Sequence, residues 1–229
     1  DKSGDIILAK KGNEFVCQSC GAVYPKWQGK CDACGEWNTI VEEKIGGEGF
    51  SNITPKKKGK MIDFVPLSGE ERALDRIKTN IKELDRVSGG GLVPSSVILV
   101  GGDPGIGKST LLLQVCASIA GSAGNPECYY ISGEEAIDQV RIRAKRLRLE
   151  QTPVKLASAT EVKDIIATLE KSNAAVVIID SIQTMYLDEV ESTPGSVAQV
   201  RACAYELIKL AKRKGFVLFL VGHVTKQGS

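Results

Sequence analysis

The sequence lacks several features that would assign a protein to a membrane or a secretory route. No apolar run approaches the ~20 residues that a membrane-spanning helix requires. Residues 1–11 contain no apolar segment behind a basic start, so we expect no secretory signal there. A strong charge of one sign is also missing, because 30 Lys and Arg face 28 Asp and Glu, for a formal net charge of +2. Any contact with a nucleic acid must therefore come from local basic surface rather than from bulk charge.

Internal repeats and long low-complexity segments are absent, and the composition is otherwise ordinary. Of the 229 residues, 42% are hydrophobic and 25% charged, which is typical of a soluble globular protein with one sizeable core and a small appendage. The seven cysteines are an odd number. Four are closely spaced, and the other three lie in apolar stretches: Cys116, Cys128 and Cys203. This distribution argues against a disulfide framework and for a reducing compartment, so it predicts a cytoplasmic protein.

The most informative segment present is a match to the phosphate-binding pattern G-x-x-x-x-G-K-[ST] at every fixed position. Its residues, with the threonine that follows, are Gly102, Asp103, Pro104, Gly105, Ile106, Gly107, Lys108, Ser109 and Thr110. A β-branched apolar run precedes the segment and a helix-forming run follows it, which is the context that the motif requires. Glycines let successive backbone N–H groups approach a phosphate, and the helix start adds its positive dipole end. We predict that Lys108 contacts the β- and γ-phosphates of ATP and that the Ser109 hydroxyl binds Mg²⁺.

Carboxylates follow two further apolar runs that are typical of strands. The run that ends in Asp180 is typical of a Walker B strand, which predicts that Asp180 holds the Mg²⁺ shell through water or through Ser109. The run 129–132 is followed by Glu134 and Glu135. One of these acids can polarise the attacking water as a general base. The alternative is that they merely begin the next helix, where acidic side chains suit the helix dipole.

His223 is the only histidine and follows the apolar run 217–221. At a strand end on the γ-phosphate side it could sense the phosphate and bind the nucleotide. A purely structural role is the alternative, and the spacing alone does not decide between the two.

Strand-like and helix-like segments alternate through the larger part of the chain. Strands are expected at 97–101, 128–132, 154–157, 176–180 and 216–221, and helices at 108–121, 134–148, 161–172 and 196–214. This alternation predicts an α/β fold with a mostly parallel sheet and helices on both faces. Such sheets bind ligands at the carboxyl ends of their strands, where the motifs above lie.

A compact cysteine-rich unit at 14–41 carries two C-x-x-C pairs. Its cysteines are Cys17, Cys20, Cys31 and Cys34. Two such pairs can close a tetrahedral site of four thiolates, which favours Zn²⁺ over the alternative of an Fe–S site. Four protein ligands leave no position for water, so we expect a structural site that supplies much of the unit's folding free energy. Trp27 and Trp37 either stack on nucleic acid or cover the metal site. The covering role is slightly favoured for Trp37, and the choice is open for Trp27.

Residues 42–62 read as a linker, with Gly46, Gly47 and Gly49, then a basic run at 55–60, and no apolar period. The basic run favours a solvated linker over a nucleic-acid contact. The predicted organisation is therefore a zinc module with four cysteine ligands at 14–41, this linker, and an ATPase domain at 63–229.

These segments together resemble the bacterial RadA, or Sms, family of DNA repair proteins, which are RecA-like ATPases. The resembling segments are 17–39 for the zinc module, 84–94 and 101–110 for the ATPase entry, 132–135 for the catalytic glutamate, and 222–226 for the strand leading into the DNA-binding loop. The resemblance places the catalytic glutamate at Glu134. One departure is Ser95, where the family usually has glycine after a proline, and it is expected to stiffen that turn.

The resemblance implies an ATP hydrolase and helicase stimulated by single-stranded DNA. It further implies branch migration of recombination intermediates, work beside the main recombinase, and a homo-hexameric ring. The family continues past the position of Ser229 with a DNA-binding loop, a Lys-Asn-Arg-Phe-Gly motif and a Lon-protease-like domain, so we expect the ATPase domain here to be incomplete at its C-terminal side. DNA contact is expected beyond Lys226 and, more weakly, in a mobile loop at 185–197.

Two other hypotheses remain at this stage. One is a regulatory ATPase of the RecA superfamily, as in clock proteins of the KaiC type, against which the zinc module argues. The other is a zinc-bearing docking module whose nucleotide site acts as a switch.

Overall fold

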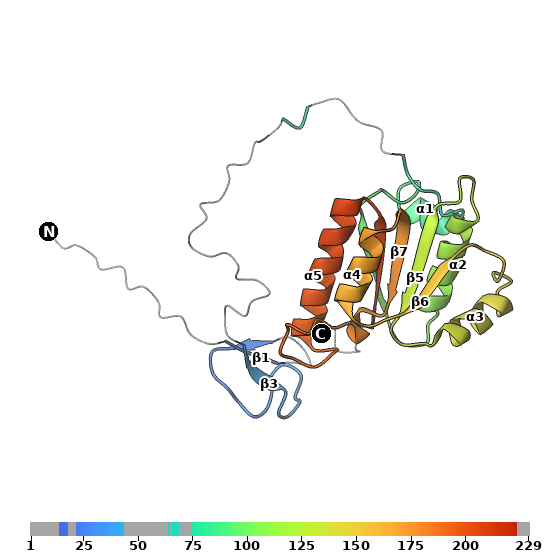
Figure 1. Cartoon of the computed structure of the whole chain (residues 1–229). Helices are drawn as coiled ribbons and strands as arrows, with labels where there is room; N and C mark the ends of the chain where they lie inside the picture. The colour runs from blue at the N-terminus through green and yellow to red at the C-terminus, as the bar shows by residue number, and fades with distance from the viewer. Residues whose placement is uncertain (1–13, 18–21, 44–63, 65, 69–74, 224–229) are drawn as a thin grey trace. The chain divides into compact units, whose positions relative to one another are not determined.

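The computed structural model describes residues 14–17, 22–43, 64, 66–68 and 75–223 (Figure 1). The chain divides into two compact units, with the division between Met61 and Ile62. Within the described ranges no helix combines the length and the apolar character that crossing a membrane requires. Cys20, most of the expected linker and the segment 224–229 lie outside the described residues.

The N-terminal unit is built on a small antiparallel sheet. Strands β1 (Glu14–Cys17), β2 (Val23–Tyr24) and β3 (Ile40–Glu43) are arranged in the order β2-β1-β3. Cys17 pairs with Ile40 in the β1–β3 register. Two cysteines, Cys17 and Cys31, form the buried centre of this small core together with Ile40.

The larger unit contains a five-stranded sheet in which every neighbouring pair is parallel. Its strands are β4 (Val97–Gly102), β5 (Glu127–Ser132), β6 (Lys155–Ser158), β7 (Ala174–Asp180) and β8 (Val217–His223), in the order β4-β8-β7-β5-β6. The predicted α/β fold is thereby confirmed. The central strands β7 and β8 are buried on both faces, which explains why they read as continuous apolar runs.

Helices cover both faces of this sheet (Figure 1). The helices are α1 (Lys82–Val87), α2 (Lys108–Ala120), α3 (Ile137–Arg146), α4 (Val162–Glu170) and α5 (Val197–Lys214), with a short 3₁₀ helix at Ile182–Thr184. Side chains of α1, α2 and α3 pack on one face, and those of α4 and α5 pack on the other. The expected helix start at Glu134 is wrong, because α3 begins at Ile137 and both acids precede it.

The turn before β4 contains the one departure from the family pattern noted in the sequence. Ser95 has φ of +65°, in the left-handed region that glycine adopts most easily. Its N–H donates to the carbonyl oxygen of Gly215 at 3.1 Å, which ties the turn to the end of α5. Serine therefore holds a backbone conformation here for which glycine is better suited.

Candidate functional site

The predicted phosphate-binding loop joins β4 to α2, as its motif requires. Gly102, Gly105 and Gly107 have φ values of +155°, +79° and +99°, and Gly107 immediately precedes the first residue of α2. A Cβ at Gly102 would lie 2.5 Å from Cδ1 of Ile106. The sharp turn thus depends on glycine for its backbone angles, whereas the exposed tip of Ile106 could move away from a Cβ.

Lys108 is the first residue of α2, and its side chain turns back into the loop. It is only 7% exposed. Its Nζ donates to the carbonyl oxygens of Gly102 and Asp103, both at 2.8 Å. The ammonium group is therefore held on the concave side of the loop, at the positive end of the helix dipole, where phosphate oxygens would bind.

Asp180 ends β7 and is 4% exposed. Its Oδ2 accepts a hydrogen bond from the hydroxyl of Tyr130, whereas its Oδ1 is buried and has no partner within the described part of the chain. The Ser109 side chain lies near enough to the Tyr130 hydroxyl to lower the pKa of that phenol slightly, so both predicted magnesium-binding side chains adjoin Tyr130. A buried carboxylate oxygen without a partner fits a Mg²⁺ ion or one of its waters.

Burial, reinforced by the negative charge of Asp180, raises the pKa of Tyr130 far above its ordinary value. The phenol therefore keeps its proton and serves as a donor at any physiological pH.

Glu134 lies in the turn after β5 and is held by side chains from two other strand ends. Its Oε1 accepts a hydrogen bond from the Ser181 hydroxyl and lies 2.8 Å from Nε2 of His223. Burial alone would raise the pKa of Glu134, but the hydrogen bonds from Ser181 and His223 and the nearby charge of Lys108 outweigh it, and the pKa is lowered. Glu134 is therefore ionised at neutral pH and able to accept a hydrogen bond from water.

Glu135 points to a different partner from its neighbour. Its Oε2 lies 2.6 Å from Nη1 of Arg143 on α3, and its N–H donates to the Ser132 hydroxyl at 2.9 Å. The two acids therefore have different partners, and neither belongs to α3. Of the two, only Glu134 contacts His223 and Ser181.

His223 lies beside the start of the phosphate-binding loop because β8 pairs with β4, with His223 opposite Gly102. Its Nε2 contacts Glu134, and its Nδ1 is buried without a partner among the described residues. The structure therefore places His223 next to both the predicted base and the phosphate-binding loop. Sequence reasoning missed the contact itself, since the two residues are 89 positions apart.

The segment 185–197, expected to be a mobile loop, is anchored in the structure. Met185 and Leu187 are buried, and Gln199 on α5 is bonded to its backbone. The Gln199 Nε2 donates to the carbonyl oxygens of Leu187, Val190 and Ser192, and its Oε1 accepts from the Leu187 N–H. One amide therefore ties residues 187–192 to α5, and mobility of the segment 185–197 stays a prediction.

Three of the four predicted zinc ligands converge in the N-terminal unit. The Sγ atoms of Cys17, Cys31 and Cys34 all lie within 4.8 Å of one another, and the fourth predicted ligand, Cys20, lies outside the described residues. The Tyr24 hydroxyl lies 3.1 Å from the Cys31 sulfur, and the Thr39 hydroxyl lies 3.2 Å from the Cys17 sulfur. Converging thiols with hydroxyl partners fit a thiolate-bound zinc ion and its supporting hydrogen bonds.

The two tryptophans of this unit are exposed. Trp27 is 59% and Trp37 is 67% exposed, and Lys30 Nζ lies 5.6 Å from the ring centroid of Trp37. The Trp27 Nε1 donates to the carbonyl oxygen of Ile40 at 3.0 Å, which fixes that indole. Neither tryptophan belongs to the small core around the cysteines, which includes Phe15, Ala22, Tyr24 and Ile40, and the covering role for Trp37 stays a prediction.

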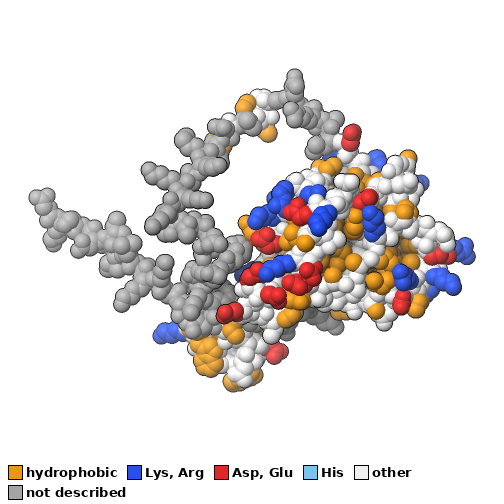
Figure 2. Space-filling view, in the orientation of Figure 1, with side chains coloured by type: hydrophobic (Ala, Val, Ile, Leu, Met, Phe, Trp, Pro, Cys, Tyr) orange, Lys and Arg blue, Asp and Glu red, His pale blue; other side chains and the backbone are white. Residues whose placement is uncertain are grey.

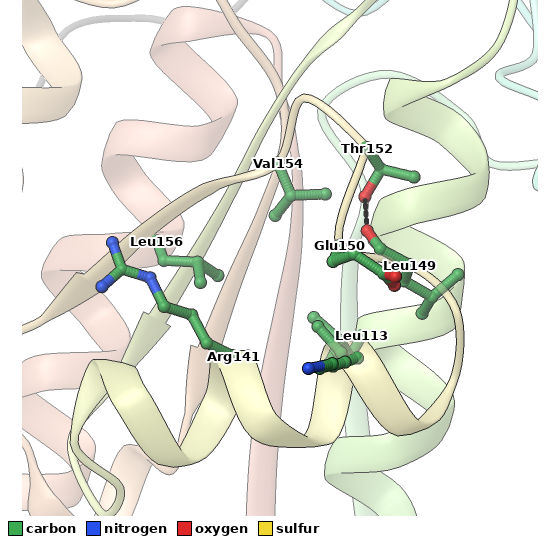
Figure 3. Close-up of a pocket in the computed structure, with 9 residues that line it drawn as sticks. Leu113, Arg141, Leu149, Glu150, Thr152, Val154 and Leu156 are labelled. Atoms are coloured by element: carbon green, nitrogen blue, oxygen red, sulfur yellow. Dashed lines mark hydrogen bonds between the residues drawn. The ribbon is translucent and has the colours of Figure 1, made fainter.

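Within the larger unit, a pocket of about 430 Å³ lies between α2, α3 and β6 (Figure 3). It is lined by apolar side chains, among them Leu113 and Leu156, with charged groups including Arg141 and Glu150. No predicted site residue lines it. On the face shown in Figure 2, basic and acidic side chains of the larger unit are intermixed, so this face offers no extended patch of one sign.

The fold and the phosphate-binding loop define a P-loop ATPase of the AAA class. Residues 68–229 match the family described as AAA domain, and the chain belongs to that family. Residues 15–42 match a rubredoxin metal binding domain.

Relatives named DNA repair protein RadA match nearly the whole chain, which confirms the resemblance to bacterial RadA. The Brucella abortus protein is 49% identical over 96% of the chain, that of Bacillus subtilis 46% over 97%, and that of Pseudomonas aeruginosa 43% over 97%. The chain covers 49% of each of these three relatives, about half their length.

Proposed function

We propose that this chain is the ATP-hydrolysing part of a DNA repair protein that acts on single-stranded DNA. The observation that carries the proposal is the placement of Lys108, Asp180 and Glu134 at the carboxyl ends of three strands of one parallel sheet, β4, β7 and β5, with the charge of Lys108 near Glu134. The names of the relatives support a role in DNA repair. The proposal extends to helicase movement and to branch migration of recombination intermediates. It also includes work beside the main recombinase, a homo-hexameric ring and a cytoplasmic location.

In the proposed reaction, water attacks the γ-phosphorus of ATP, the bond to the bridging oxygen breaks, and ADP and phosphate leave. Backbone N–H groups of residues 105–109 and the Lys108 ammonium bind the β- and γ-phosphates. Ser109 and Asp180 hold Mg²⁺, which when bound neutralises charge on the phosphate oxygens. Glu134 orients the attacking water and takes its proton. His223 and Ser181 hold the Glu134 carboxylate in place.

The test compares ATP hydrolysis with and without single-stranded DNA for three forms of the protein. Glu134→Gln keeps the size of the side chain but removes the base, so it should bind nucleotide and turn over about 10²–10⁴-fold more slowly. Glu135→Gln is the matched control and should lose much less, because Glu135 contacts Arg143. Parent-like turnover by Glu134→Gln, or a larger loss for Glu135→Gln, would contradict the assignment.

The same assay separates the proposed function from its alternatives. Hydrolysis that DNA leaves unchanged would favour a regulatory ATPase, and nucleotide binding without turnover in the parent would favour a docking switch. For DNA itself we expect weak binding by this chain with a shallow salt dependence, since few phosphate contacts are available. Tight and steeply salt-dependent binding would contradict this and would direct attention to the basic run 55–60 or the zinc module.

A further inference from the structure

A chain of buried and half-buried polar contacts connects Asp180 to the residue beside the proposed base. It runs from the Asp180 carboxylate to the Tyr130 hydroxyl, on to the Arg143 guanidinium, and ends at Glu135. None of these four residues belongs to the phosphate-binding motif. We propose that Tyr130 is a positioning residue that fixes the Asp180 carboxylate for Mg²⁺, and that Arg143, held by Glu135, fixes the Tyr130 hydroxyl. The inference rests on the proposed function.

Tyr130 is placed for this role by the sheet. It lies on β5, is fully buried, and is opposite Ile178 in the β5–β7 register, two residues before Asp180. The phenol therefore reaches across to the end of the neighbouring strand. A buried tyrosine ring would pack equally well as phenylalanine, so the hydroxyl is explained only by its polar partners.

Arg143 determines the direction in which the Tyr130 proton points. The Arg143 Nη2 lies 3.3 Å from the Tyr130 oxygen, and a guanidinium can only donate hydrogen bonds. The phenolic oxygen must therefore accept from Arg143, which leaves its single proton for Asp180. The Arg143 Nη1 is in turn 2.6 Å from the Glu135 carboxylate, so the guanidinium plane is held at both ends.

The consequence for Asp180 is that its two oxygens are no longer equivalent. Oδ2 is occupied by the phenol, and Oδ1 is the buried oxygen without a partner in the described ranges. Oδ1 has its full acceptor capacity for the Mg²⁺ shell, whereas Oδ2 already accepts from the phenol, and rotation of the carboxylate would break the bond to Tyr130. Tyr130 thus fixes the orientation in which Asp180 presents Oδ1 to the ion. Arg143 connects this orientation to the segment that carries Glu134.

The test measures binding of a fluorescent ADP analogue to the purified protein while Mg²⁺ is titrated from zero. Tyr130→Phe should raise the half-saturating Mg²⁺ concentration about tenfold, the loss expected for one hydrogen bond to a charged group. Binding of the analogue in EDTA should be unchanged, because the phosphate-binding loop is intact. Tyr129→Phe is the matched control, since that hydroxyl donates to Glu127 at 2.8 Å, and it should leave both measurements unchanged.

A second variant keeps the inference testable if Tyr130→Phe fails to fold. Arg143→Gln removes the group that directs the phenol while keeping the phenol itself, and it should raise the Mg²⁺ requirement by a smaller factor, about threefold. Far-UV circular dichroism verifies that each variant is folded. Parent-like Mg²⁺ dependence in folded Tyr130→Phe would overturn the inference while leaving the proposed function intact. Failure of the parent to bind the analogue at all would overturn both.

Discussion

Replacing Gln199 with alanine should lower the free energy of unfolding by about 3–4 kcal/mol. Gln199 is 2% exposed, and its amide accepts one hydrogen bond from the Leu187 N–H and shares its two N–H donors among three carbonyl oxygens of the segment 187–192, at 2.9 to 3.1 Å, which amounts to about three full bonds. Each such bond contributes about 1 kcal/mol net. The buried Leu187 N–H would also lose its acceptor, which places the total at the upper end of this range. A loss of this size is a large fraction of the ~5–15 kcal/mol that stabilises a typical domain.

The assay is urea unfolding followed by far-UV circular dichroism, with the midpoint and slope fitted for each variant. Gln114→Ala is the matched control, because Gln114 is an exposed glutamine in the middle of α2 and its loss should change stability by less than about 0.5 kcal/mol. Gln199→Glu adds a test of the donor role, since a carboxylate cannot donate to the three carbonyl oxygens, and we expect it to destabilise at least as much as alanine. A loss below about 1 kcal/mol for Gln199→Ala would refute the reasoning, because the contacts of this amide could not then hold the segment.

Three further predictions concern the two units. Cys31→Ser should abolish the binding of zinc measured by elemental analysis, whereas Cys203→Ser, in the core of the larger unit, should retain it; zinc retained by Cys31→Ser would exclude the proposed centre. Ser95→Gly should raise the unfolding midpoint in urea, by up to about 1 kcal/mol in stability, because glycine relieves the positive φ. Because the pKa of Glu134 is lowered in the folded state, its ionised carboxylate stabilises the fold at pH values above the ordinary carboxyl pKa. This stabilisation is lost as the pH falls through the lowered pKa. Glu134→Gln should therefore flatten the acid limb of the stability profile below about pH 4.5, and an unchanged limb would show that the carboxylate is not held as described.

The sequence was sufficient to predict the sheet and its helices because their signals are local. Each of the five strands lies within two residues of its predicted bounds, and β7 and β8 were recognisable because burial on both faces makes them continuously apolar. The phosphate-binding loop was equally readable, since its glycines, lysine and serine occupy consecutive positions between a strand and a helix.

Contacts between distant residues could not be predicted in this way. Tyr130 meets Asp180 across 50 positions, and Glu134 meets His223 across 89. The start of α3 was misplaced for a related reason. An acidic pair at 134–135 resembles a first helical turn, but in the folded chain these carboxylates bond to Ser181, His223 and Arg143 instead. Gln199 was missed because a glutamine in a helix gives no local sign that it serves a neighbouring segment.

The pairing of β4 with β8 has a consequence for how the protein is made. Val97 pairs with Leu218, so the strand that supports the phosphate-binding loop gains its partner about 120 residues later in synthesis. Strand pairs of such high sequence separation form slowly, because a long loop must close before the contact is made. A nascent chain that has emerged only as far as α5 would carry every residue of the phosphate-binding motif while β4 lacked its neighbour. The nucleotide site is therefore expected to mature late, when β8 inserts between β4 and β7 and brings His223 to its place.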